Sequence, residues 1–404
     1  MDKTDPWRRL AILYAGLFIA SVPAGMARPA LAFHLRYDLG ATMVATASLT
    51  SSFMAGRALS SIASGFIGEL APNRKRLIIG LGVASIGLFL LLVLPSLGRA
   101  ETVVAFTSIW GMLGGITWPT LQVAVAEMGK ARSGLALSIY YATASLGISL
   151  GNWLFGHLSV SYTEMLELAG AILILSSPII ALAVEPVGEP AGKRRLKRAL
   201  TRVRDPVILW VIIAAFAIGI LNGVLREYFY IYSHEVFGLT KASLGDVLTT
   251  AGVFSVLLSL TVGPLSDKYG IPRLLLVVLA ITGIGGLLVG DPLGSVLILS
   301  TGYVLAAGGA RSSLPLTRNA GIAGRTGGAM VVGASNMASS LGMLSGPPIA
   351  GFVYQHSPGY AGVPFIAASL FVFAVMAAYI VIVVTRSRRR TGLYIHGVKV
   401  VTSG

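Results

Sequence analysis

The chain has 404 residues, of which 55% are hydrophobic and only 12% are charged, and its formal net charge is +15. A soluble protein of this composition would lack polar surface, and the long apolar runs lack the alternation of membrane-barrel strands. The composition therefore indicates a helical membrane protein, because helices satisfy their own backbone hydrogen bonds in lipid.

Twelve apolar segments are long enough to cross a bilayer, for which roughly 20 helical residues suffice. In chain order they are 9–34, 42–69, 76–97, 102–128, 133–157, 164–186, 206–232, 242–266, 273–290, 294–317, 327–354 and 361–385. Of the 31 Lys and Arg residues, four lie in the interior of these segments and three on the side away from the termini, which leaves 24 on the side of the termini, including those at the very start of a segment. The positive-inside rule therefore predicts a multi-pass protein of the plasma membrane with both termini in the cytoplasm.

The basic excess follows from this topology and from contact with anionic lipid, so we expect no nucleic-acid partner. One polar stretch, EPVGEPAGKRRLKRALTRVRDP, divides the chain into halves of similar length. Together with the twelve apolar segments, this division predicts an all-α membrane protein with two pseudo-symmetric bundles of six transmembrane helices each. The predicted parts are an N-terminal bundle at 1–185, a basic cytoplasmic linker at 186–205, a C-terminal bundle at 206–386 and a cytoplasmic tail at 387–404.

The two halves repeat a charge pattern. Arg28 and Arg226 both lie in apolar segments, and each is followed 41 residues later by an acid, Glu69 or Asp267. The two arginines are 198 residues apart, and the glycines that open the two acidic motifs have the same separation. Parallel repeats of this kind are characteristic of two-lobed transporters.

The acidic segments GFIGELAPNRKR and GPLSDKYGIPR resemble the loop signatures of the major facilitator superfamily. The second copy matches the pattern of glycine, acid, basic residue and glycine, whereas the first has Glu69 in place of aspartate and Leu70 in place of the basic residue. In that family the acid contacts a neighbouring helix end and an arginine, as a latch on the outward-open state. The resemblance implies this role for Gly65, Glu69, Arg74, Arg132, Gly263, Asp267, Lys268 and Gly270.

Four arginines fall within the predicted spans, and a charge at bilayer depth is expensive and by default functional. They are Arg28, Arg57, Arg226 and Arg311, and the clearly intramembrane acid is Glu227. Arginine keeps its charge in a protein, and its planar fork matches carboxylate or phosphate. The sequence thus predicts a positive cavity that binds an anion, although a structural role for Arg57 and Arg311 stays open.

A symmetric arginine pair on helices 1 and 7 is similar to that of the organic-anion and organophosphate/phosphate branch of the superfamily, where the pair holds the substrate between the lobes. Uncharged residues on cavity-lining helices could add contacts. The candidate substrate-binding residues are therefore Arg28, Arg57, Trp118, Gln122, Asn222, Arg226, Tyr228 and Arg311.

Glu227 is the first candidate for proton coupling, because burial favours a neutral carboxyl whereas an adjacent arginine favours the charged form. A structural salt bridge is the open alternative for this residue. His34, near the outer end of the first segment, is the second candidate, with a hydrogen-bonded interface histidine as its alternative.

We expect a monomeric secondary transporter that moves a small anionic solute, an organic anion or a phosphate-type anion, by alternating access. A proton or a counter-transported anion would drive it, with no cofactor. The alternative of the same fold, a proton-driven multidrug exporter, calls for an acid on helix 1, where this chain has arginine. An enzyme or a sensor fits less well: there is no HExxH or Walker motif, no cysteine for thiol chemistry, and no soluble domain.

Overall fold

The computed structural model describes residues 6–70, 74–129, 132–184, 206–269, 271–322 and 328–392. Within these ranges all regular structure is helical, which confirms the predicted fold class. The predicted linker at 186–205 lies outside the described residues, so the domain boundaries remain a prediction.

The described part of the first half forms six α-helices, and the bounds of five of them agree with the predicted segments to within about one turn. The six helices are α1 (Pro6–Phe33), α2 (Met43–Leu70), α3 (Lys75–Leu88), α4 (Ala100–Gly129), α5 (Ser133–His157) and α6 (Tyr162–Ala183). The exception is α3, which continues as π-helical and 3-10 turns to Ser96. A π-helical turn, His34–Asp38, extends α1, and a second one, Phe89–Val93, extends α3. A capping box between Ser161 and Glu164 fixes the start of α6.

The described part of the second half contains seven α-helices, because the predicted segment 206–232 is interrupted. They are α8 (Pro206–Val224), α9 (Glu227–Phe237), α10 (Lys241–Tyr269), α11 (Ile271–Gly290), α12 (Val296–Ile322), α13 (Gly328–His356) and α14 (Val363–Gly392). With α8 and α9 counted as one span, each half has six. Seven stretches of the described chain are long and apolar enough by themselves to cross a membrane.

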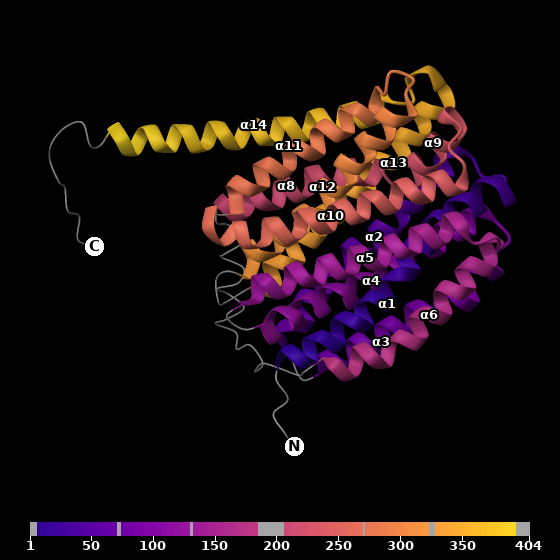
Figure 1. Cartoon of the computed structure of the whole chain (residues 1–404), viewed down its shortest axis with the longest axis horizontal. Coiled ribbons are helices and arrows are strands. Elements are labelled where there is room, and N and C mark those ends of the chain that lie inside the picture. The colour runs from indigo at the N-terminus through magenta and orange to yellow at the C-terminus, as the bar shows by residue number, and fades with distance from the viewer. Residues whose placement is uncertain are drawn as a thin grey trace.

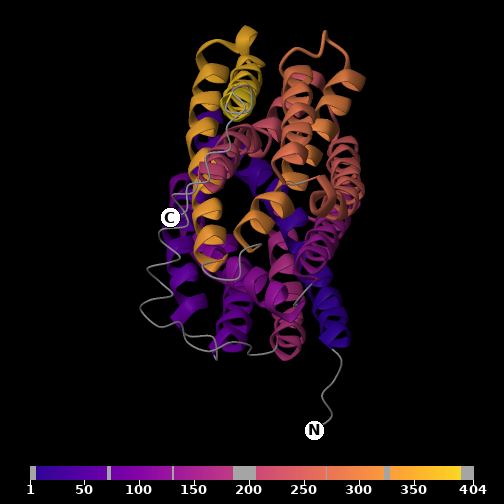
Figure 2. The same ribbon diagram turned by 90° about the vertical axis from the view of Figure 1, so that its left-hand side faces the viewer.

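The two halves lie side by side along their length, as the colours of Figure 1 show, with α1–α6 on one side and α8–α14 on the other. The start of α1 and the end of α14 point toward the same end of the molecule, here called the terminal end. The opposite end is called the distal end. Figure 2 views the bundle from the terminal end and shows the same division between the halves.

Two pairs of helices make the main contact between the halves, α2 with α13 and α5 with α10. Glycines allow this contact near the distal end: a Cβ added to Gly351 would lie 2.8 Å from the Cα of Val44, and one added to Gly245 would lie 2.8 Å from the Cα of Gly156. Small residues let helix backbones approach closely in lipid. The halves are therefore packed tightly at the distal end.

Candidate functional site

A cavity of about 250 Å³ lies between the two halves. Seven of the eight residues predicted to contact a substrate line it: Arg28, Arg57, Trp118, Gln122, Asn222, Arg226 and Arg311. The four arginines come from α1, α2, the α8–α9 junction and α12, so the fold brings together charges that are far apart in sequence. The carboxylate that pairs with one of these arginines in the described structure is that of Glu227.

Arg28 and Glu227 form a buried ion pair that joins the halves. The Nη1 of Arg28 lies 2.8 Å from Oε1 of Glu227, and the exposed fractions of the two side chains are 11% and 3%. Thr50 donates its hydroxyl proton to the other carboxylate oxygen, Oε2. The Arg28 guanidinium also lies 4.1 Å from the ring centroid of Phe53, as in a cation–π contact. Glu227 thus makes the structural salt bridge that the sequence left open, and a role in proton coupling remains a proposal.

The break between α8 and α9 positions both members of the sequence pair Arg226–Glu227. Arg226 leaves the helical conformation, with φ −105° and ψ −126°, and Glu227 becomes the first residue of α9. A carboxylate in the first turn of a helix is stabilised by the helix dipole. The break therefore directs the Glu227 carboxylate to Arg28 and leaves the Arg226 side chain to the cavity.

Arg226 and Arg311 each have a donor that the described structure leaves without a hydrogen-bond partner. These buried atoms are Nε of Arg226 and Nη1 of Arg311. A buried donor without a partner costs about 1–3 kcal/mol, and more if it is charged. Both side chains also line the cavity, so these donors belong to residues of its wall.

Arg57 is held differently, by an amide chain that crosses between the halves. Its Nη2 donates to Oδ1 of Asn336 at 3.3 Å, and Nδ2 of Asn336 donates to Oε1 of Gln122 at 3.5 Å. The side chain of Arg57 lines the cavity, so its predicted structural and cavity-lining roles are both present.

Tyr228 is placed away from the cavity, contrary to the prediction. Its hydroxyl donates to the carbonyl of Ala361 at 2.6 Å, and its ring packs 5.4 Å from that of Phe365, within the second half. Tyr230 lines the cavity instead. The reason is the break at Arg226, which changes the helical phase of the residues that follow it.

His34 lies outside the cavity lining, two turns beyond Arg28 toward the distal end. It is buried, and its Nδ1 lies 2.8 Å from Oδ2 of Asp38. This is the hydrogen-bonded arrangement that the sequence left open. Coupling through His34 would have to act at the distal end rather than at the cavity.

The sequence also missed residues that line the cavity. Asn152 on α5 is 3% exposed, and its Nδ2 has no hydrogen-bond partner in the described structure. Trp110 and Tyr303 add aromatic walls. Aromatic residues in apolar segments are usually core, so no sequence signal separated these two. For Asn152 a sequence signal was available. It is the polar residue in the segment SLGISLGNWLFG at the position where the related segment SLGMLSGPPIAG of the second half has proline.

The predicted latch is only partly described. Arg74, Arg132 and Lys268 are exposed. The carboxylates and glycines of the two motifs lie outside the residues whose side chains are described, namely Gly65, Glu69, Gly263, Asp267 and Gly270. A related contact is visible nearby, where the fully buried Lys75 donates to Oε1 of Glu127 at 2.7 Å and ties α3 to α4. The latch itself remains a prediction.

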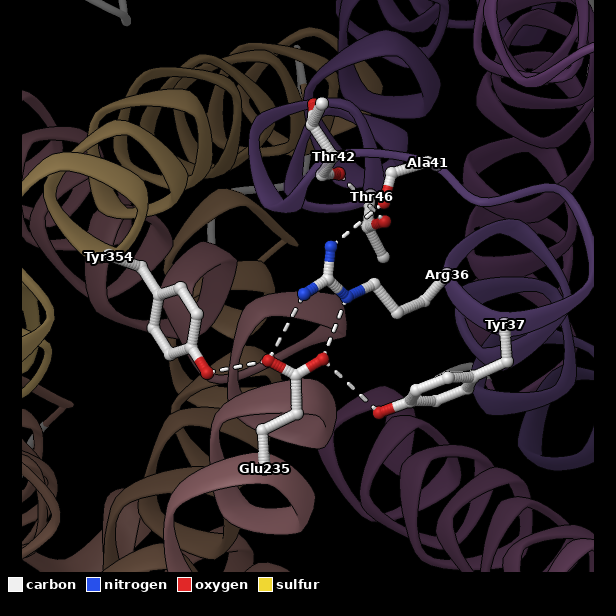
Figure 3. Close-up of polar contacts among 7 residues, drawn as sticks. All are labelled: Arg36, Tyr37, Ala41, Thr42, Thr46, Glu235 and Tyr354. Atoms are coloured by element: carbon white, nitrogen blue, oxygen red, sulfur yellow. Dashed lines mark hydrogen bonds and ion pairs between the residues drawn. The ribbon is translucent and has the colours of Figure 1, made fainter.

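Four side chains join the halves at the distal end, and we call them the distal clamp: Arg36, Tyr37, Glu235 and Tyr354 (Figure 3). Arg36 donates to both carboxylate oxygens of Glu235, from Nε at 2.7 Å and from Nη2 at 3.2 Å. The tyrosine hydroxyls donate to the same carboxylate, at 3.3 Å from Tyr37 and 2.6 Å from Tyr354. Arg36 also donates to the carbonyl of Ala41 at 2.9 Å. The carboxylate thus connects the turn after α1 with α9 and α13.

We expect Glu235→Gln to loosen the distal end, because one charge-assisted, bidentate contact is lost. A hydrogen bond to a charged group contributes roughly 1.5 kcal/mol, which corresponds to about tenfold in the open population. The chain has no cysteine, so Ser51→Cys gives a single thiol between α2 and α13, where the Ser51 hydroxyl now donates to the carbonyl of Leu344. Labelling by a membrane-impermeant thiol reagent should become about tenfold faster.

Glu101→Gln provides the matched control, because Glu101 is an exposed acid in the first turn of α4. It should leave the labelling rate unchanged. Equal rates for Glu235→Gln and the parent would show that the distal clamp does not hold this end closed.

The chain matches the family model of the Major Facilitator Superfamily over residues 13–245 and 231–395. Among curated proteins, it is 24% identical over 295 residues to multidrug resistance protein MdtG of Rahnella sp. (strain Y9602), covering 69% of this chain and 71% of the relative. It is 25% identical over 300 residues to MdtG of Dickeya zeae (strain Ech586), covering 70% and 72%.

Solved structures share the fold. The human organic anion transporter MFSD10 (TETRAN) superposes with a TM-score of 0.70 at 18% identity, over 93% of this chain and 99% of the other. The E. coli fucose:proton symporter FucP gives a TM-score of 0.66 at 16% identity, over 92% and 98%. The nucleoside transporter NupG gives 0.71 at 11% identity, over 92% and 99%. At these identities the likeness concerns the fold alone.

Proposed function

Since this chain belongs to the major facilitator superfamily, a family of membrane transporters, we propose that it moves a small anionic solute by alternating access through the cavity between its halves. The observation that supports this proposal is the pair of buried arginine donors without partners, Nε of Arg226 and Nη1 of Arg311. An anion placed between them would satisfy both. It would also offset the repulsion among the four cavity arginines.

The Arg28–Glu227 ion pair suggests how transport is coupled. The pair spans the two halves, so it must part when the halves rock about the cavity. Separating two buried charges is costly unless each finds a new partner. A proton can neutralise Glu227, and the substrate anion can take its place beside Arg28. Both proton coupling and anion exchange work through this one contact.

We further propose that the protein resides in the plasma membrane as a monomer, with both termini in the cytoplasm. The support for this orientation is the distribution of Lys and Arg along the chain, because the basic side predicted from the sequence coincides with the terminal end. On this orientation, the tightly packed distal end faces outward.

Export of cationic drugs is the second candidate function. The curated relatives at 24% and 25% identity are named multidrug resistance proteins. The aromatic walls of the cavity, including Trp110 and Trp118, would suit a planar cation. The arginines weigh against it, because they outnumber the carboxylate in contact with them and would repel such a substrate.

Competition in proteoliposomes tests the proposal against this alternative. Purified protein is reconstituted, and uptake of labelled methanesulfonate, acetate and inorganic phosphate is compared with uptake of a cationic dye, under an imposed proton gradient and with internal anion. We expect saturable uptake of at least one anion and no competition by the dye. Saturable transport of the dye without uptake of any anion would contradict the proposal and support drug export.

A further inference from the structure

Two positive charges of the cavity wall have no counter-charge among the residues that the structure describes. Of the arginines that line the cavity, Arg28 forms an ion pair with Glu227, so these two charges offset each other. Arg226 and Arg311 form neither an ion pair nor a side-chain hydrogen bond with another described residue. The group of these four side chains therefore carries a net charge of two positive units.

Arg226 and Arg311 act on the same part of the cavity. Both guanidinium groups interact electrostatically with the phenols of Tyr230 and Tyr303, two lining residues of the second half. A phenol is uncharged near neutral pH, so it can accept a hydrogen bond but does not offset a charge. Two like charges in the interior of a protein repel each other more strongly than in water. Each arginine therefore disfavours the other until negative charge lies near them.

The size of the cavity restricts how that negative charge can be supplied. The volume of about 250 Å³ is below the range of roughly 300–1,000 Å³ typical of pockets for drug-sized ligands. Two separate monoanions would repel each other in this space, and each would lose its translational freedom on binding. One small solute with two negative charges supplies the same charge and loses translational freedom only once.

We infer that the preferred substrate is a small dianion, and this inference rests on the proposed function. Its two negative charges, on a dicarboxylate, a disulfonate or a phosphate monoester, offset the charges of Arg226 and Arg311. Arg28 and Glu227 already offset each other, so the loaded group of side chains has equal charge of both signs. A monoanion would leave one positive charge of this group without a counter-charge, and a neutral solute would leave two.

Three pairs of small solutes test the inference in proteoliposomes. Each pair contains a dianion and a monoanion of related structure: succinate with succinamate, ethane-1,2-disulfonate with 2-hydroxyethanesulfonate, and methyl phosphate with dimethyl phosphate. At about pH 7.5 the carboxyl and phosphate groups are ionised. In the pair that is carried with the lowest KM, the dianion should have the lower KM by roughly tenfold to a hundredfold, the effect of one hydrogen bond to a charged group.

The outcomes of this comparison separate the inference from the proposed function. A dianion whose KM is equal to or higher than that of its monoanion, in the best-carried pair, would overturn the inference and leave the proposed function intact. Uptake of none of the six solutes would overturn both.

Two variants of one residue locate the charge that the dianion meets. Arg226→Gln and Arg226→Lys both lose the planar fork, so uptake should fall in both, but only Arg226→Gln loses the charge. The readout is the KM of the monoanion divided by the KM of the dianion, which a general loss of folded protein does not change. This ratio should fall by roughly tenfold in Arg226→Gln and stay near the parent value in Arg226→Lys. Equal ratios in the two variants would show that the charge of Arg226 does not select the dianion, and would overturn the inference.

Discussion

Replacing Arg226 and Arg311 together with glutamine should abolish anion uptake and leave the protein folded. Each arginine offers a buried donor without a partner in the described structure. A hydrogen bond to a charged group contributes about 1.5–3 kcal/mol, so each replacement should weaken binding by roughly tenfold to a hundredfold. The loss of two like charges from a positive cavity relieves repulsion, so the midpoint of thermal unfolding should stay the same or rise.

Three further variants sharpen this experiment. Arg226→Lys keeps the charge but lacks the planar fork, so it should bind with intermediate affinity. Arg57→Gln should have a smaller effect than Arg226→Gln, because Arg57 already donates to Asn336. Arg99→Gln, at an exposed distal loop, is the control for charge alone. Full uptake by the Arg226→Gln, Arg311→Gln double variant would refute the anion site.

Glu227→Gln should destabilise the protein by about 3–5 kcal/mol, because it leaves the buried Arg28 charge without its counter-ion. The carboxylate accepts from Arg28 at 2.8 Å and from the Thr50 hydroxyl, and a glutamine side chain can replace only one of these acceptors. Thermal unfolding in detergent measures the loss. Transport should fall as well, because the contact proposed to couple the halves is gone.

A double-mutant cycle separates the charge effect from packing. Arg28→Gln alone leaves Glu227 unpaired, whereas the double variant with Glu227→Gln leaves a neutral amide pair. We expect the double variant to recover most of the lost stability and none of the coupled transport. If the two single losses simply add in the double variant, the ion pair does not stabilise the fold. Thr50→Val serves as a milder test of the same carboxylate, with an expected loss of about 1.5–3 kcal/mol.

Much of the fold could be predicted from the sequence, because lipid imposes a strong rule on helix length and polarity. The apolar segments gave the helices, and the 198-residue repeat of Arg28 and Arg226 indicated two related halves. The break at Arg226 was not predictable, since neither proline nor glycine occurs at Leu225, Arg226 or Glu227. The break coincides with the ion pair between Glu227 and Arg28, a tertiary contact that the local sequence does not reveal.

The candidate site shows the same limit. Residue type and depth were enough to select the four cavity arginines, because a charge in lipid is so costly. The partners of these arginines could not be predicted in the same way, because pairing depends on how the helices are arranged in space. The sequence suggested that Arg28 and Arg226 face each other as equals, whereas in the structure Arg28 is held by Glu227 and Arg226 retains an unpartnered donor. The sequence predicted Tyr228 rather than Tyr230 as a cavity residue, because the helical phase after Arg226 could not be determined from the sequence.

Two of the ion pairs that the structure describes between the halves share a sequence separation. Arg28 with Glu227 and Arg36 with Glu235 are each separated by 199 residues, one more than the internal repeat. At the repeat offset, the positions that match the two acids in the first half are Pro29 and Tyr37. Each half therefore carries one sign of charge in these contacts, the first both cations and the second both anions. If the two halves were made as separate chains, this charge pattern would favour association of a first half with a second half. Two copies of the same half would bring like charges together at these contacts. The two halves have therefore become dependent on each other, and neither could be replaced by a second copy of the other.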